Sequence, residues 1–124
     1  FFLMHILSHN YLSTSRKNYH LQLSDVSQLL DMDTGNLSRQ ETGQSLPNLT
    51  TILGYHILFE TSIHQLFKED YMKLYDEIIN RALVLQEQLQ SQKTSKVKHR
   101  LKAVQTILNR LVPDELYYES EEDE

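Results

Sequence analysis

One arginine stands among short polar residues in the stretch Thr34-Gly-Asn-Leu-Ser-Arg39. The planar fork of Arg39 can donate two parallel hydrogen bonds to guanine O6 and N7, and short polar side chains can contact other base edges in the major groove of DNA. A phosphate contact or an exposed surface charge is the alternative reading of Arg39. The residues that we expect to read bases are Thr34, Gly35, Asn36, Ser38 and Arg39. Gly35 has no side chain, so it can only allow close approach.

Two short helices joined by a tight turn must position these residues. Val26, Leu29 and Leu30 give the first helix one apolar face, and Ser24 is expected to be its N-cap. Asp33 is expected to cap a second helix over 34–42, with Leu37, Gln40 and Glu41 facing inward. Gly43 and Pro47 favour a stop after Thr42. This arrangement predicts a helix-turn-helix.

The segment Leu37-Ser-Arg-Gln-Glu-Thr-Gly43, with Pro47 following, resembles the phage-repressor and Cro-like (XRE) family of helix-turn-helix regulators. The resemblance covers about Leu12 to Phe67. It implies a five-helix DNA-binding domain in which Thr34, Gly35 and Arg39 touch bases. It also implies a structural salt bridge between Arg16 and Glu41. Leu23 departs from the family, which has a polar residue there, and Asp31 replaces a common turn glycine.

Phosphate contacts are expected at the start of the first of these two helices, and also at and after the end of the second. Gln22 and Ser24 flank a helix start, where backbone N–H groups can meet a phosphate, although ordinary capping is the alternative. The expected phosphate-contacting residues are Gln22, Ser24, Thr42, Gln44, Ser45 and Asn48.

The remaining helices of the first domain are expected over 10–19, over 47–60 and around 63–67. Their predicted inward residues are apolar or lie at helical spacing from apolar residues. They are Tyr11, Leu12, Ser15 and Tyr19 in the first helix, Leu49, Ile52, Leu53, Ile57 and Phe59 in the fourth, and Ile63, Leu66 and Phe67 in the fifth.

The second half of the chain carries two heptad-spaced seams separated by Ser91–Ser95, where Thr94 or Ser95 can cap a helix. They predict a helical hairpin over 68–112 that Pro113 ends. The seam residues are Tyr71, Tyr75, Ile78, Ala82, Leu85, Leu89, Val97, Leu101, Val104, Leu108 and Leu111. Further apolar residues beside both seams indicate packing against a second copy, so these seams are expected to serve dimerisation, or else packing against the first domain.

Charge is divided unevenly along the chain. Residues 1–67 carry three Lys/Arg against five Asp/Glu, residues 68–112 carry nine against five, and residues 113–124 carry none against seven. This balance is too acidic for tight phosphate binding by one copy. We therefore expect a homodimeric transcriptional repressor on a palindromic duplex. The alternative is a module that binds a partner protein through the hairpin, as an antitoxin binds its toxin.

Other functions find little support in the sequence. The chain has no cysteine, and His5 and His9 form only a lone one-turn pair, so no metal site, cofactor or catalytic residue is expected. The apolar arm 1–8 is too short to cross a bilayer, so no membrane contact is expected, and the absence of cysteine indicates a reducing, cytoplasmic setting. The basic run 93–102 is expected to be a solvated helix face, or else a contact for DNA or a partner. The acidic tail 113–124 is expected to be disordered, or else to fold back on that run.

Overall fold

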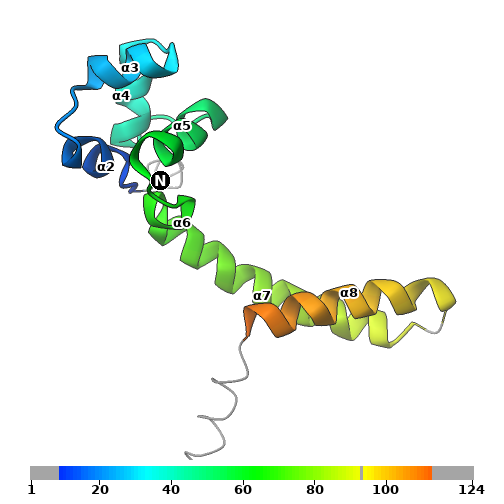
Figure 1. The fold of residues 1–124 in the computed structure, drawn as a ribbon. Helices are drawn as coiled ribbons and strands as arrows, with labels where there is room; N and C mark the ends of the chain where they lie inside the picture. Colours follow the sequence, from blue (N-terminus) through cyan, green and yellow to red (C-terminus); the bar gives the residue numbers. More distant parts are fainter. Residues whose placement is uncertain (1–8, 93, 113–124) are drawn as a thin grey trace, which may run out of the picture. The chain divides into compact units, whose positions relative to one another are not determined.

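The computed structural model describes residues 9–92 and 94–112, and this part of the chain contains seven helices and no strand (Figure 1). The helices are α2 (Leu12–Asn18), α3 (Leu23–Leu30), α4 (Thr34–Thr42), α5 (Leu49–Phe59), α6 (Ile63–Leu66), α7 (Lys68–Gln90) and α8 (Ser95–Leu111). The expected all-α class is therefore confirmed. The apolar arm 1–8 and the acidic tail 113–124 lie outside the described residues.

The chain divides into two compact units, with the boundary between Met72 and Lys73. The sequence predicts a hairpin that begins at residue 68, so the observed boundary lies later in the chain than predicted. The first turn of α7 belongs with the N-terminal unit because the Tyr11 hydroxyl donates a 2.6 Å hydrogen bond to Glu69 Oε1. This hydrogen bond raises the pKa of Tyr11 and lowers the pKa of Glu69.

The core of the N-terminal unit lies among α2 to α6. Its fully or almost fully buried apolar residues are Leu12, Val26, Leu37, Tyr55, Phe59 and Leu66. Six partly buried apolar side chains complete it, among them Leu30 and Met32. The Tyr55 and Phe59 rings meet edge to face at 5.3 Å, a favourable geometry for aromatic pairs.

The predicted orientation of α5 is wrong. Leu49, Leu53 and Ile57 were expected in the core, yet Leu49 is 68% exposed and Ile57 is 73% exposed. Phe59 is buried as predicted, but the other buried side chains of α5 are Thr51 and Tyr55. Apolar residues occur all around this helix, so periodicity alone could not define its inner face. Thr51 and Tyr55 can be buried because both hydroxyls have partners, Met32 Sδ and Glu41 Oε2.

Four further details differ from the sequence prediction. Leu29 is 58% exposed, and Ser27 is buried beside Val26 because its hydroxyl donates to the Leu23 carbonyl at 2.9 Å. Ile63 is exposed at the start of the single-turn α6. Tyr19 is also exposed, although its ring packs against Phe59 at 5.1 Å.

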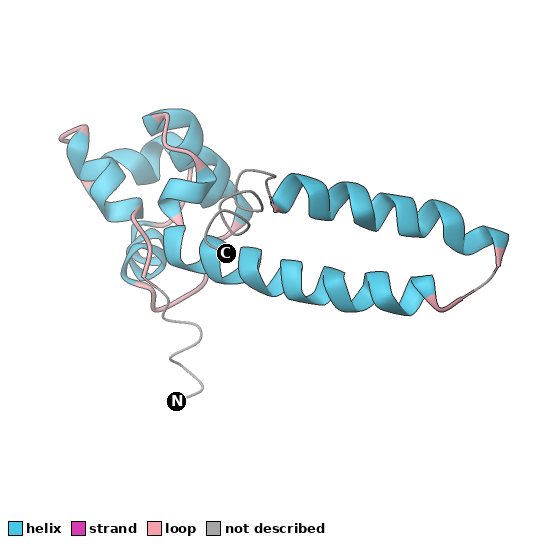
Figure 2. Ribbon diagram, turned by 90° about the horizontal axis from the view of Figure 1, so that it is seen from below, coloured by secondary structure: helices cyan, strands magenta, loops and turns pink. Residues whose placement is uncertain are grey.

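In the second unit, α7 and α8 lie side by side and run in opposite directions (Figure 2). The Tyr75 hydroxyl donates a 2.7 Å hydrogen bond to the Leu111 carbonyl and ties the two helices together. Thr94 is the N-cap residue of α8. Their shared core is formed by Leu89, Val97, Val104 and Leu108, with Ile79, Ala82 and Leu101 packed against it.

The expected dimerisation seam is therefore largely used inside one chain. Six of its residues, including Leu89, Val97, Val104 and Leu108, lie in the core between α7 and α8. Tyr75 and Leu111 are partly buried and joined by the hydrogen bond above. Only Tyr71, Ile78 and Leu85 are exposed members of the seam. A second copy cannot pack on the buried residues while the two helices stay together.

Candidate nucleic-acid interface

Capping at both ends fixes α4, which spans the predicted residues 34–42. The Asp33 Oδ2 atom accepts a 2.9 Å hydrogen bond from the Asn36 backbone N–H. Gly43 ends the helix with φ 84°, a left-handed conformation that suits glycine. Asp31, which ends α3, adopts the same region with φ 52° and ψ 54°. Only three residues therefore connect α3 to α4.

The inner face of α4 holds the helix through both apolar and polar contacts. Leu37 is fully buried, and Gln40 is buried beside it. The Gln40 side-chain oxygen accepts from the Asn48 backbone N–H at 2.9 Å, and the Gln40 backbone carbonyl accepts from Asn10 Nδ2 at 3.0 Å. One buried glutamine therefore connects α4 to the segments that precede α2 and α5.

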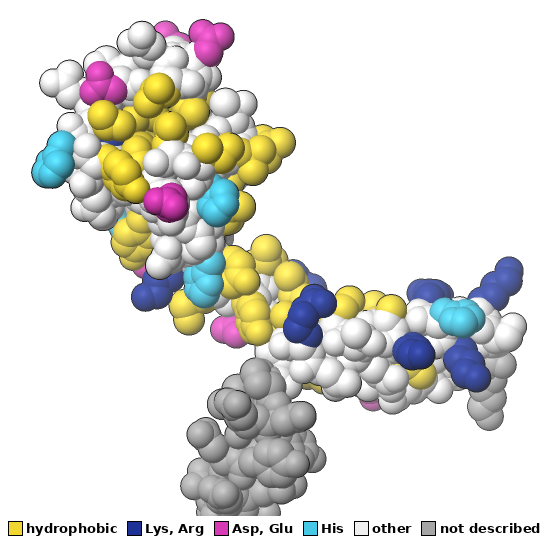
Figure 3. Space-filling model, in the orientation of Figure 1, with side chains coloured by type: hydrophobic (Ala, Val, Ile, Leu, Met, Phe, Trp, Pro, Cys, Tyr) yellow, Lys and Arg dark blue, Asp and Glu magenta, His cyan; other side chains and the backbone are white. Residues whose placement is uncertain are grey.

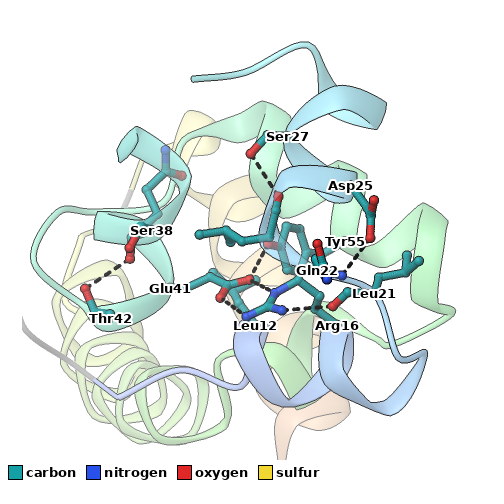
Figure 4. A network of polar contacts seen from close by, with 12 residues as sticks. Leu12, Arg16, Leu21, Gln22, Asp25, Ser27, Ser38, Glu41, Thr42 and Tyr55 are labelled. Atoms are coloured by element: carbon teal, nitrogen blue, oxygen red, sulfur yellow. Dashed lines mark hydrogen bonds and ion pairs between the residues drawn. The ribbon is translucent and has the colours of Figure 1, made fainter. Parts of the chain in front are cut away.

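A charged network anchors the end of α4, as Figure 4 shows. Arg16 Nε donates to Glu41 Oε2 and Arg16 Nη2 donates to Glu41 Oε1, both at 2.9 Å. A third donor of Arg16, Nη1, binds the Leu21 carbonyl at 2.9 Å. The salt bridge that the family resemblance implies is therefore present. Only 11% of the Arg16 side chain and 5% of the Glu41 side chain are exposed.

Tyr55 completes this network and was not among the predicted site residues. Its hydroxyl donates a 2.5 Å hydrogen bond to Glu41 Oε2. Burial and this hydrogen bond raise the pKa of Tyr55 well above the ordinary value, so the phenol stays protonated. The hydrogen bond to Glu41 also raises the pKa of Arg16. Nothing in the spacing of the sequence pairs Tyr55 with Glu41, because the two residues meet only in the folded unit.

The outer face of α4 presents the predicted base-reading residues to solvent. Thr34, Gly35, Asn36 and Arg39 are exposed, and Ser38 is partly exposed. Arg39 Nη2 donates a hydrogen bond to Asn36 Oδ1, one helical turn earlier. A Cβ atom on Gly35 would lie 3.5 Å from Arg39 Nη1 and 3.1 Å from Asp33 Oδ2. The guanidinium therefore lies beside Gly35, at an ordinary van der Waals distance from the place of a Cβ atom.

The predicted phosphate contacts fall into two sets at element ends. Gln22 and Ser24 are exposed at the start of α3. Gln22, not Ser24, is the N-cap residue, because its backbone N–H donates to Asp25 Oδ2 at 2.8 Å and the helix starts at Leu23. The prediction of Ser24 as the cap is therefore wrong.

The other set follows the outer face of α4 into the next loop. Thr42 and Gln44 are exposed, and Ser45 is partly exposed. The Thr42 hydroxyl donates to the Ser38 carbonyl at 3.1 Å, and Asn48 Oδ1 caps α5 by accepting from the Thr51 N–H at 2.9 Å. Both groups already have partners within the chain, so a contact with phosphate must share or replace them.

The electrostatic field around α4 is not basic. Arg39 is the one Lys or Arg on α4, and Arg16 is neutralised by Glu41, whereas Asp25, Asp31 and Asp33 are exposed on α3 and the turn. Figure 3 shows few Lys or Arg side chains on the visible face of the N-terminal unit, where hydrophobic side chains gather instead. Phosphate attraction by one copy of this unit is consequently weak.

The described ranges contain neither a metal-binding cluster nor a membrane-spanning helix. Within residues 9–92 and 94–112, no three His, Asp or Glu side chains are grouped so that they could hold a metal ion. No helix in these ranges combines the length and the apolar character needed to span a bilayer. Comparison of the chain with protein families, with curated proteins and with solved structures finds no match.

Proposed function

We propose that the N-terminal unit binds double-stranded DNA sequence-specifically, as part of a transcriptional repressor, by placing α4 in the major groove. The observation that carries this proposal is the exposed Arg39 guanidinium, hydrogen-bonded to Asn36 on a helix that is capped at both ends. An α helix with its side chains is about 10–12 Å in diameter, which suits a groove about 12 Å wide. The resemblance to phage-repressor and Cro-like regulators supports the same reading.

Asn36 would position Arg39 for base recognition. Its side-chain oxygen accepts one of the two N–H groups of Nη2. The remaining N–H groups of the guanidinium are left for guanine O6 and N7. A side chain that is already held loses less conformational entropy on binding than a freely rotating one. We therefore expect a guanine at the base pair that Arg39 meets.

Two copies would act together on a palindromic duplex. The single cation on α4 gives one unit little phosphate affinity, and linking two units raises the effective concentration of the second. The second unit keeps exposed apolar side chains outside its core, such as Leu83 and Val84, which a second copy could cover. This supports a homodimer with two α4 helices on one face of the duplex.

A binding selection from random duplexes, run at a stated salt concentration, tests the proposal. The wild-type chain should select sequences that contain guanine at a fixed position in each half-site. Arg39→Ala should lose this preference. Arg39→Lys should lose it too while keeping the salt dependence, because lysine retains the charge without the fork. Lys17→Ala, a change at an exposed cation on α2, is the matched control and should leave the preference intact. A wild-type chain without any sequence preference would rule the proposal out.

A second candidate function is a protein-interaction module, such as an antitoxin. One specific observation favours it. Leu49, Leu53 and Ile57 form an exposed row on α5, with exposed Leu46 just before it. The helix carries no Asp, Glu, Lys or Arg, so this row is an uncharged apolar surface of the type that protein partners cover. Partner binding that survives Arg39→Ala but is lost in Leu53→Glu would favour this function.

A further inference from the structure

A groove runs between α7 and α8 on one side of the second unit. Its volume is about 230 Å³, and it is lined by Ile78, Arg81, Ala82, Leu85, Val104 and Ile107. Pockets for drug-sized ligands have volumes of about 300–1,000 Å³. The groove is therefore sized for one or two side chains of a peptide segment. Ile78, Leu85 and Ile107 are partly open to solvent there, so an occupant would cover apolar surface.

Cations border this groove on both helices. Arg81 lines it from α7. On α8, Arg100 precedes Val104 by four residues and Arg110 follows Ile107 by three, so helical spacing puts both arginines on the groove side. All three arginines are exposed, as are the other Lys and Arg residues of α8, and Figure 3 shows dark blue side chains gathered on the second unit.

Acidic side chains are sparse on the same side. Among the described residues of the second unit, Asp and Glu occur only on α7, as Asp76, Glu77 and Glu87. Asp76 lies two residues from Ile78 and Glu87 lies two residues from Leu85, a spacing that turns them away from the groove. Glu77 is 3.2 Å from Arg81 and offsets one charge. The groove is thus an apolar floor with a positively charged border.

These features select an acidic occupant with apolar side chains. A second copy presenting the same groove would bring arginines against arginines, which is unfavourable. A nucleic-acid backbone would satisfy the arginines but leave Ile78, Leu85 and Ile107 without an apolar partner. An acidic peptide segment with Leu or aromatic residues satisfies both parts of the groove.

Such a segment follows α8 in this chain. Residues 113–124 contain seven Asp or Glu side chains and no Lys or Arg, and three apolar residues, Leu116, Tyr117 and Tyr118, stand between the acids. Val104 precedes Val112 by eight residues, which is about 12 Å of helix. Leu116 to Tyr118 follow Val112 by four to six residues and can reach about 13–20 Å when extended. The segment is therefore long enough to bring its apolar residues to the groove.

We infer that Leu116, Tyr117 and Tyr118 bind in the groove between α7 and α8, with their flanking carboxylates on Arg81, Arg100 and Arg110. Covalent attachment gives the segment an effective concentration on the order of millimolar, so an individually weak contact suffices. Binding covers the apolar floor and neutralises the main basic surface of the described chain, which lowers non-specific attraction to nucleic acid. This inference does not depend on the function of α4.

A tryptophan probe in the full chain tests the inference, because the chain contains no natural tryptophan. Tyr117→Trp should emit at shorter wavelength than the unfolded chain and should be protected from acrylamide. Adding Ile107→Glu or Arg100→Glu should shift the emission to that of an exposed indole, and high salt should weaken the protection. Asn80→Glu is the matched control, an exposed α7 position outside the groove lining, and it should leave the emission unchanged.

Circular dichroism should show that each variant keeps its helices. Sedimentation distinguishes a segment that binds the groove of its own chain from one that binds the groove of a second copy. Either result supports the inference. Solvent-like emission of Tyr117→Trp at low salt would overturn it. An emission wavelength that stays unchanged in both groove variants would overturn it as well. If Arg100→Glu loses non-specific duplex binding and the indole is exposed in the Tyr117→Trp chain without a groove substitution, the arginines are instead assigned to phosphate contacts. Because the readout is fluorescence without DNA, failure of the proposed regulator function leaves this test unaffected.

Discussion

Arg16 and Glu41 meet through two parallel hydrogen bonds of 2.9 Å, and both side chains are almost completely buried. Such a pair connects α2 to the last turn of α4 and so determines where the exposed face of α4 points. Removing either partner should be strongly destabilising, because the other charge is then left buried without compensation.

Glu41→Ala should therefore destabilise the chain strongly. It leaves the Arg16 guanidinium buried with only the Leu21 carbonyl as a partner, and we expect the free energy of unfolding to fall by about 3 kcal/mol or more. Chemical denaturation gives the measurement. Glu77→Ala breaks the exposed pair with Arg81 and should cost less than about 1 kcal/mol. Equal losses for the two variants would contradict the anchoring role of Glu41.

Tyr55 should make stability sensitive to alkaline pH. Its pKa in the folded chain is raised, so above about pH 10 the unfolded chain releases the phenol proton and the folded chain does not. The contribution of Tyr55 is thus complete below that pH and decreases as the pH rises. Tyr55→Phe should unfold more easily at neutral pH but lose less stability between neutral and alkaline pH than the wild type. The measurement is the free energy of unfolding as a function of pH. Parallel curves for wild type and Tyr55→Phe would show that the phenol does not contribute this sensitivity.

Gly35→Ala should change base preference more than stability. Alanine in a helix gains about 1 kcal/mol over glycine, and the contact of the new Cβ at 3.1 Å from the capping Asp33 carboxylate offsets part of that gain. The same Cβ lies at an ordinary 3.5 Å from Arg39 Nη1, but it stands on the exposed face of α4 and limits the close approach to base edges that glycine allows. Selection from random duplexes should report an altered or lost guanine preference, while thermal unfolding stays nearly constant. A variant with an unchanged preference would mean that base reading does not need close approach at residue 35.

Gly54 marks a close approach of α5 to α3. A Cβ there would lie 2.4 Å from Leu30 Cδ2 and 3.0 Å from Leu30 Cδ1. Gly54→Ala should destabilise by about 1–3 kcal/mol, because overpacking forces the leucine out of position. The double variant Leu30→Ala with Gly54→Ala should lose less than the sum of the single losses, since the smaller side chain removes the clash. Strict additivity in denaturation experiments would argue against this contact.

Asp31→Gly should stabilise the chain. The residue holds φ 52°, and glycine removes the left-handed strain at the price of a more flexible unfolded chain, for a net gain of about 0.5 kcal/mol. Glu60→Gly, at φ 50° after α5, is the parallel case and should behave alike. A lower melting temperature for Asp31→Gly would indicate that the carboxylate makes a favourable contribution at this turn.

Local signals predicted some parts of the fold well. The Asp33 cap and the Gly43 terminus gave the bounds of α4 because capping depends on neighbouring residues. The inward side of α5 was mistaken because Leu49, Leu53 and Ile57 are as apolar as the residues that are buried. Burial of Thr51 and Tyr55 depends on partners elsewhere in the fold, Met32 and Glu41, and such long-range contacts leave no periodic pattern in the sequence.

The same distinction applies to the candidate site. Arg39 could be singled out from its residue type and its place on α4. Its partner Asn36 was only one of several expected base-reading residues, because a hydrogen bond one turn away depends on the rotamers of both side chains. The seams of the second unit were read correctly as apolar seams, but spacing alone does not say whether the facing helix belongs to the same chain or to another copy.

The buried Gln40 has a consequence for how this chain could change over generations. Its amide and backbone fasten α4 from the inside, so none of the contacts that fix the helix involve the side chains of Thr34, Asn36 or Ser38. Those positions can be exchanged with little risk to folding. A library randomised there, with Gln40 kept constant, would sample new duplex preferences on one unaltered framework.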